Sequence, residues 1–134
     1  MKTFMIAIVI FLVMLIGTGI YINWIDSVSE EFAGRSAAMH DVAENENWPA
    51  CKQKMAEFFC EWNRIYPRLE FFIHHKEIDT INNLLYELDG YIKVHDRDGF
   101  LVRNGVLQNL LLLLPVGERL NWENILCTEM KPFT

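Results

Sequence analysis

The chain has 134 residues, of which 51% are hydrophobic and 22% charged, and its formal net charge is −6. This length leaves room for one small domain. Eleven of the 12 basic residues and all 18 acidic residues follow residue 24, so the larger part of the chain is acidic. Because it lacks a basic stripe, we expect it neither to bind nucleic acid nor to adhere electrostatically to an anionic membrane surface.

An uncharged apolar run of 19 residues, Phe4 to Ile22, lies near the N-terminus. A helix of that length rises about 28 Å, which is close to the hydrocarbon thickness of a bilayer. Tyr21 and Trp24 stand where an interfacial aromatic belt is expected. We therefore predict that residues 1–24 form a cytoplasmic N-terminus and a transmembrane anchor, with the span at residues 4–22, and that residues 25–134 form an extracytoplasmic domain.

The charges that flank the run predict its orientation. The amino terminus and Lys2 are the positive charges before it, whereas three acidic residues follow it before Arg35. The positive-inside rule then keeps the N-terminus in the cytoplasm of a single-pass cell-membrane protein. The alternative is secretion after cleavage of a signal peptide at Ser27-Val28-Ser29, although the apolar region of such peptides usually has only about 7–15 residues.

The rest of the chain is predicted to be all-α, because alternating strand patterns are missing. Three stretches repeat apolar residues at three- and four-residue spacing, which indicates one buried face on each helix. The rows are Ile25, Val28, Phe32, Met39 and Val42; Trp48, Cys51, Met55, Phe58, Trp62, Ile65 and Leu69; and Ile78, Ile81, Leu85, Leu88 and Ile92. The first stretch is expected to continue the membrane helix or to form a stalk nearly joined to it.

Several residues mark the predicted ends of the helices. Asn47 suits an N-cap and Pro49 a first helical turn. The second and third rows are out of phase by one residue, or about 100°, which predicts a break between Pro67 and His75. The segment VHDRDG is predicted to be a charged loop, and Pro115 is expected to end a fourth helix at Leu114.

The fourth helix carries five consecutive leucines, Leu110 to Leu114, which cover every face. We expect it to be the most buried helix of the bundle, or to meet a partner with one side. Trp122 and Ile125 are expected to pack back on the bundle end. The fold prediction is therefore an N-terminal transmembrane helix followed by a small up-down bundle of three to four helices. Its core is expected to include Trp48, Phe58, Phe59, Trp62, Phe71, Phe72 and the leucines.

The string FFIHHKEIDTINNLLYELDGYI resembles the signature of an uncharacterised bacterial membrane-anchored family, domain of unknown function 4363. The family motif, close to D-H-x-E-I-D-x-I, falls here on His75, Glu77, Ile78, Asp79 and Ile81, and a closing segment near L-x-x-N-I falls on Leu120 to Leu126. His74 replaces the acid usual before that histidine, and leucines replace a second histidine common in the late helix. The resemblance implies membrane association in Gram-positive, often spore-forming, bacteria, and it carries no known activity.

The HHKEID segment is the one concentration of side chains able to do chemistry. His75 and Asp79 are four residues apart and share a helix face, a spacing that can hold a metal; His74 and Glu77 are expected to lie toward the apolar row. A zinc site takes three or four protein ligands, and no second cluster supplies them. We therefore interpret the segment as a helix start and predict no metal, catalytic or cofactor-binding residue, with His75 and Asp79 as the sole candidate metal ligands.

The three cysteines, Cys51, Cys60 and Cys127, form no metal motif. Cys51 and Cys60 are predicted on one helix facing opposite ways, so they cannot bond each other, whereas a Cys60–Cys127 bridge stays open. Two classes of function remain. The favoured one is an anchored structural or protein-interaction module, not an enzyme, that needs no cofactor and contacts another protein or a second copy. The alternative is an extracytoplasmic metal- or ligand-binding sensor or enzyme that uses the HHKEID segment.

Overall fold

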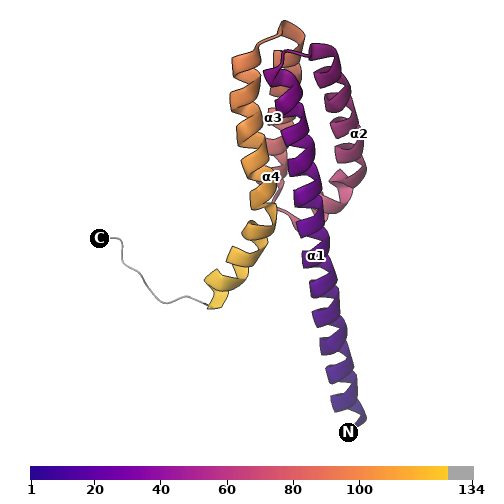
Figure 1. The fold of residues 1–134 in the computed structure, drawn as a ribbon. Helices are drawn as coiled ribbons and strands as arrows, with labels where there is room; N and C mark the ends of the chain where they lie inside the picture. Colours follow the sequence, from indigo (N-terminus) through magenta and orange to yellow (C-terminus); the bar gives the residue numbers. More distant parts are fainter. Residues whose placement is uncertain (127–134) are drawn as a thin grey trace, which may run out of the picture.

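The computed structural model describes the backbone of residues 1–126 and the side chains of residues 1–116. Four helices follow one another: α1 (Lys2–Glu44), α2 (Trp48–Phe72), α3 (His75–Val94) and α4 (Arg97–Leu126). They run alternately up and down, and the N-terminal half of α1 projects from one end of the bundle (Figure 1). The predicted fold class, a long apolar N-terminal helix leading into a small all-α bundle, is confirmed.

Helix α1 has 43 residues and joins the apolar run to the bundle without an interruption. The large apolar side chains from Phe4 to Ile20 are 43% to 71% exposed, and the first buried side chain is that of Ile25. The predicted row on this helix is buried from Ile25 to Met39, whereas Val42 is only partly buried. The apolar N-terminal run and the first bundle helix are therefore one continuous element, as expected.

The turns that join the helices are short, and side chains cap the helices that follow two of them. The side-chain oxygen of Asn47 accepts a hydrogen bond of 3.4 Å from the Ala50 N–H, and Pro49 lies in the first turn of α2, as predicted. The predicted charged loop VHDRDG is shorter than expected, because only His95 and Asp96 separate α3 from α4. The Asp96 carboxylate accepts a hydrogen bond from the Gly99 N–H at 3.0 Å, which draws the next three residues into the helix.

Gly99 is required at this turn. A Cβ atom added there would lie 2.6 Å from Asp96 Oδ2 and 2.6 Å from Tyr91 Cε1. The close approach of the capping carboxylate and the tyrosine ring to the backbone therefore depends on the missing side chain.

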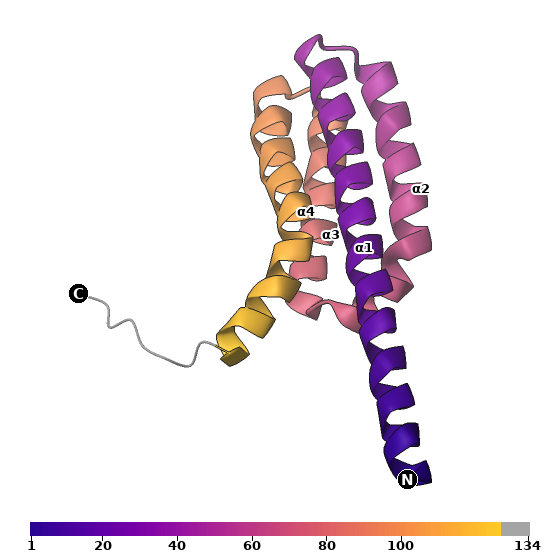
Figure 2. The same cartoon turned by 60° about the horizontal axis from the view of Figure 1, so that its bottom comes forward.

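Both prolines that were expected to mark helix ends lie inside helices. Helix α2 continues through Pro67 to Phe72, and the break falls at Ile73 and His74, within the predicted interval. Helix α4 continues through Pro115 to Leu126, so the prediction that it ends at Leu114 is wrong. Proline removes one hydrogen bond and bends a helix, but its φ is helical. The yellow end of α4 accordingly turns away from the bundle (Figures 1 and 2).

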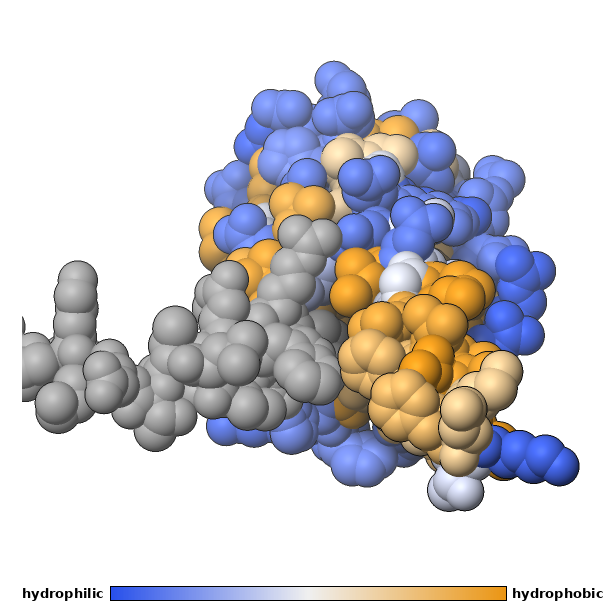
Figure 3. Space-filling view, turned by 90° about the horizontal axis from the view of Figure 1, so that it is seen from below, coloured by the Kyte–Doolittle hydropathy of each residue, from blue (hydrophilic) through white to orange (hydrophobic). Residues whose placement is uncertain are grey.

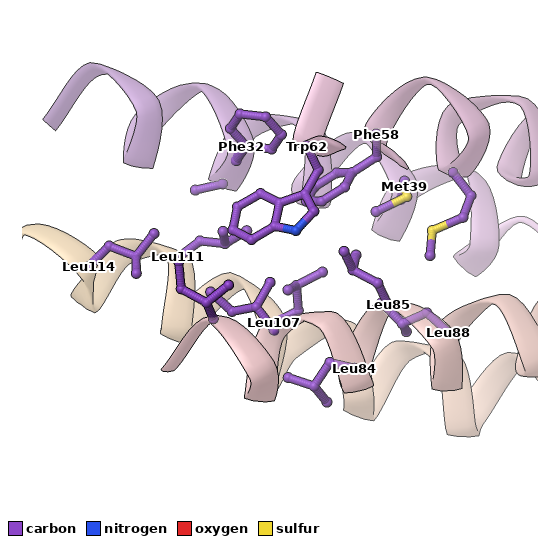
Figure 4. Close-up of a cluster of buried hydrophobic side chains, with 14 of the residues drawn as sticks. Phe32, Met39, Phe58, Trp62, Leu84, Leu85, Leu88, Leu107, Leu111 and Leu114 are labelled. Atoms are coloured by element: carbon purple, nitrogen blue, oxygen red, sulfur yellow. The ribbon is translucent and has the colours of Figure 1, made fainter. Parts of the chain in front are cut away.

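The core is formed by the predicted rows, and the two positions at its centre, Trp62 and Leu85, are 1% and 0% exposed. Phe32 meets the Trp62 ring edge-to-face, with centroids 5.5 Å apart, and the close-up shows the leucines of α3 and α4 beneath this cluster (Figure 4). The indole Nε1–H of Trp62 donates a hydrogen bond of 2.8 Å to Asn82 Oδ1. Phe71 and Phe72, expected in the core, are instead 85% and 54% exposed.

Helix α4 has two apolar faces rather than one. Its buried row is Phe100, Asn104, Leu107, Leu111 and Leu114, whereas Leu112 and Leu113 are 47% and 54% exposed. The expectation that α4 is the most buried helix is therefore wrong. The contact of Trp122 and Ile125 with the bundle, and the side chains of the closing segment, lie outside the described side chains.

Buried polar bonds fix the antiparallel register of α1 and α4. The Ser29 hydroxyl donates to the Leu111 carbonyl oxygen at 2.7 Å. Seven residues along α1, the Ser36 hydroxyl donates to Asn104 Oδ1 at 2.9 Å, while Asn104 Nδ2 donates to the Ser36 carbonyl oxygen at 2.8 Å. Because an unpaired buried amide is costly, this reciprocal pair resists sliding of one helix along the other.

Candidate functional site at the apolar end of the bundle

Most of the exposed large apolar side chains of residues 1–116 lie on the projecting half of α1. Two helices of the described chain are long and apolar enough to cross a membrane, α1 and the Arg97–Val116 part of α4. The apolar window of α1 is 0% buried, whereas α4 packs against α1 and α3 through its core row. By composition both helices are therefore candidate membrane spans, but only the run in α1 is left uncovered by the rest of the described residues.

Four aromatic rings surround the point where α1 leaves the bundle, and we call them the aromatic collar: Tyr21, Trp24, Phe71 and Phe72. The ring centroids of Tyr21 and Phe72 are 4.6 Å apart, those of Tyr21 and Trp24 are 6.3 Å apart, and those of Phe71 and Phe72 are 5.6 Å apart. Trp24, Phe71 and Phe72 also line an open hollow of about 430 Å³ together with Pro67 and Arg68. The end of α2 thus lies beside the start of the bundle half of α1.

The view from this end shows the apolar part of α1 projecting forward, with hydrophilic residues over much of the surrounding surface (Figure 3). Sequence reasoning placed Tyr21 and Trp24 here but assigned Phe71 and Phe72 to the core. The topology could have indicated their position. Both phenylalanines lie at the break between α2 and α3, and in an up-down bundle this break lies at the same end as the start of the bundle half of α1.

The HHKEID segment begins α3 at this same end, and its polar side chains face solvent. His74, His75, Lys76 and Glu77 are all exposed, so the expectation that His74 and Glu77 lie toward the apolar row is wrong. His74 precedes the helix with an extended ψ of 127°, and the exposed Glu77 lies in its first turn.

The two candidate metal ligands have separate neighbours. His75 Nδ1 lies 3.6 Å from Glu70 Oε1, with both side chains substantially exposed. Desolvation raises the pKa of the Tyr66 phenol, and the nearby carboxylates of Glu70 and Asp79 raise it further. Within the described residues, no group of three His, Cys, Asp or Glu side chains gathers to hold a metal ion.

The two described cysteines differ in reactivity. Cys51 is fully buried, and desolvation raises the pKa of its thiol to about 11. Cys60 is exposed, and the two cysteines are not bonded to each other. The open Cys60–Cys127 pairing involves a residue outside the described part of the chain. Cys60 is therefore the accessible thiol of the described bundle.

These features define a class of protein: a small antiparallel four-helix bundle that is continued at one end by an uncovered apolar helix. The model of the family described as "Domain of unknown function (DUF4363)" matches residues 20–125, and the chain belongs to this family. The match includes the aromatic collar and the HHKEID segment. Neither a curated protein nor a solved structure matches the chain significantly.

Proposed function

We propose that this protein is a single-pass membrane protein whose run Phe4–Ile22 spans the bilayer and whose bundle is an extracytoplasmic structural or interaction module. The observation that carries the proposal is the uncharged run of α1, whose large apolar side chains from Phe4 to Ile20 are at least 43% exposed. Burial of apolar surface is worth about 25 cal/mol per Å², so a bilayer around this run removes a large cost of exposure to water. The positive-inside rule supports the orientation, since Lys2 precedes the run and acidic residues follow it.

The native cysteines allow a topology test without a foreign tag. In a Cys127→Ser variant, a membrane-impermeant maleimide added to intact protoplasts of an expressing bacterium should label the exposed Cys60. Cys51 should stay unlabelled, because it is buried and its thiol is protonated at neutral pH. A further Cys60→Ser change should abolish labelling.

Two results would contradict the proposal. Labelling only after lysis would place the bundle in the cytoplasm. Release by alkaline carbonate, or a fragment in the medium that begins near Glu30, would show that the apolar run is no permanent anchor.

The interaction role is supported by the second apolar face of α4, which we call the outer α4 row: Val102, Val106, Asn109, Leu113 and Val116. Each member is exposed and lies two residues after a member of the buried row, which is about 200° around the helix. Its 4-3-4-3 spacing is typical of helices that pair. We propose a second copy of this chain as the partner, since Asn109 in the middle of the row could then bond to its own counterpart and fix the register.

Disulfide cross-linking tests this pairing in membranes. In a Cys60→Ser, Cys127→Ser background, a Val106→Cys variant should form dimers on mild oxidation. A Lys52→Cys variant, which places an equally exposed thiol on α2, is the matched control and should stay monomeric. Monomers in both variants would refute a second copy as the partner on this face.

A further inference from the structure

We infer that the turn between α2 and α3 is a second membrane contact, in which Phe71 inserts into the bilayer interface beside the point where α1 leaves it. The lipid surface itself would then cover the exposed members of the aromatic collar, Phe71 and Phe72. This inference rests on the anchor proposed above and adds a lipid-contacting element from a distant part of the chain.

The geometry of α1 sets the depth of this turn. A helix of 19 uncharged residues rises about 28 Å, whereas the hydrocarbon core is about 30 Å thick and the whole bilayer about 40–45 Å. When Phe4–Ile22 fills the core, Tyr21 lies at its outer boundary. The Phe72 ring centroid is 4.6 Å from that of Tyr21, so Phe72 must lie within the interfacial layer whenever Tyr21 does.

Phe71 is the most exposed side chain of the aromatic collar and is therefore the one most available to contact lipid. It is 85% exposed, and its ring centroid lies 5.6 Å from that of Phe72. A phenylalanine so exposed contributes little to the core, yet it stands beside the aromatic residues that favour the interface. The hollow of about 430 Å³ between Trp24 and Phe71 is open and lined mainly by apolar side chains, which suits the upper part of an acyl chain.

The charges around the turn indicate that apolar insertion, and not charge attraction, drives this contact. Arg68 and Lys76 can extend their charged ends toward lipid headgroups, but Glu70 and Glu77 lie in the same region. With mixed charges at the turn and an acidic bundle, the contact should depend little on anionic lipid or on salt.

A second contact limits how the bundle can move. A domain that is continuous with one membrane helix can still tilt and rotate in the bilayer together with that helix. Two contacts side by side, α1 and the α2–α3 turn, fix the tilt, so that the opposite end with Asn47 and His95 points away from the membrane. The outer α4 row is then held at one angle to the bilayer.

The test uses the full chain in vesicles and a fluorescent label at single cysteines. In a Cys60→Ser, Cys127→Ser background with the buried Cys51 retained, the reporter variants are Phe71→Cys, Leu12→Cys in the anchor and Tyr86→Cys. Tyr86 is the matched control, since it is an aromatic residue that is 71% exposed but lies in the middle of α3. Quenchers are nitroxide lipids in phosphatidylcholine vesicles and iodide in the water.

We expect the lipid quencher to act on residues 12 and 71 several-fold more strongly than on residue 86, and iodide to show the reverse order. High salt or added phosphatidylglycerol should not change this pattern. In a Lys76→Cys reporter, Phe71→Ser should reduce lipid quenching and Tyr86→Ser should not.

Each contrary outcome identifies what fails. Lipid quenching at residue 12 with free iodide access to residue 71 overturns the second contact and leaves the anchor standing. Protection of residue 71 from both quenchers shows that a protein surface covers it, which also overturns the inference. Loss of lipid quenching at residue 12 overturns the anchor and this inference together.

Discussion

Replacement of Trp62 by alanine should be the most damaging single change in the bundle. The indole is 1% exposed and contacts the Phe32 ring edge-to-face, and its N–H donates to Asn82 Oδ1 at 2.8 Å. Truncation of a buried aromatic side chain to alanine typically costs about 3–5 kcal/mol through lost burial and the cavity that remains. The lost hydrogen bond adds about 0.5–1.5 kcal/mol, because Asn82 is partly exposed and can regain water.

Two further variants separate these contributions. Trp62→Phe keeps most of the ring packing and loses the hydrogen bond. Its free energy of unfolding should therefore fall between those of the parent and the alanine variant. Tyr86→Ala removes an aromatic side chain that is 71% exposed and should change the free energy of unfolding by less than about 0.5 kcal/mol. The order of stability should therefore be parent, Tyr86→Ala, Trp62→Phe and Trp62→Ala.

Thermal unfolding of the full chain in detergent, followed by near-ultraviolet circular dichroism, measures this order without interference from the anchor helix. For a domain of this size, 1 kcal/mol shifts Tm by about 4–8 °C, so Trp62→Ala should melt more than about 10 °C below the parent. If Trp62→Ala melts within a degree or two of the parent, the core arrangement described here is wrong.

Three other changes have definite expected outcomes in the same unfolding assay or by calorimetry. Gly99→Ala should destabilise the bundle because its methyl group would clash with the capping carboxylate. Gly90→Ala has open space at the Cβ position and should stabilise the bundle by about 0.5–1 kcal/mol. Equal effects of the two changes would contradict the capped turn. Asn104→Ala should cost about 1–3 kcal/mol and more than Ser36→Ala, since it removes both reciprocal bonds, and the opposite order would disprove the pairing. Titration of chelator-treated protein with zinc should give no stoichiometric sub-micromolar binding, and His75→Ala should change stability by no more than about 1 kcal/mol; tight binding lost in this variant would favour the sensor or enzyme alternative.

The helices could be predicted from the sequence because each buried row follows a helical period. The uninterrupted row from Trp48 to Leu69 and its phase shift against the row from Ile78 located both α2 and the break after it. Pro115 misled the prediction of a helix end, because the statistical preference against proline ignores tertiary packing on either side of it. Helix α4 continues past Pro115 with a bend, and the sequence pattern does not indicate this continuation.

The candidate site was only half predictable. Tyr21 and Trp24 follow directly after an apolar run, so their position where α1 leaves the bundle could be predicted from their place in the chain. Phe71 and Phe72 lie beside them only because of the up-down topology. Whether an aromatic pair is exposed depends on how the neighbouring helices pack, which the sequence pattern does not indicate. The second apolar face of α4 was hidden for a similar reason, since five consecutive leucines do not reveal which of them face the core.

The bonds between α1 and α4 also impose an order of assembly. Ser29 and Ser36 are bonded to residues 82 and 68 positions later in the chain, so the first helix to be synthesised meets these partners only when the last helix is made. Until then the face of α1 that packs against α4 lies unprotected, next to an uncharged, largely apolar segment. Contacts of such long sequence separation form slowly, so the bundle can close only late in synthesis. A chain that stops before residue 104 would retain the apolar helix but could never close the bundle around it.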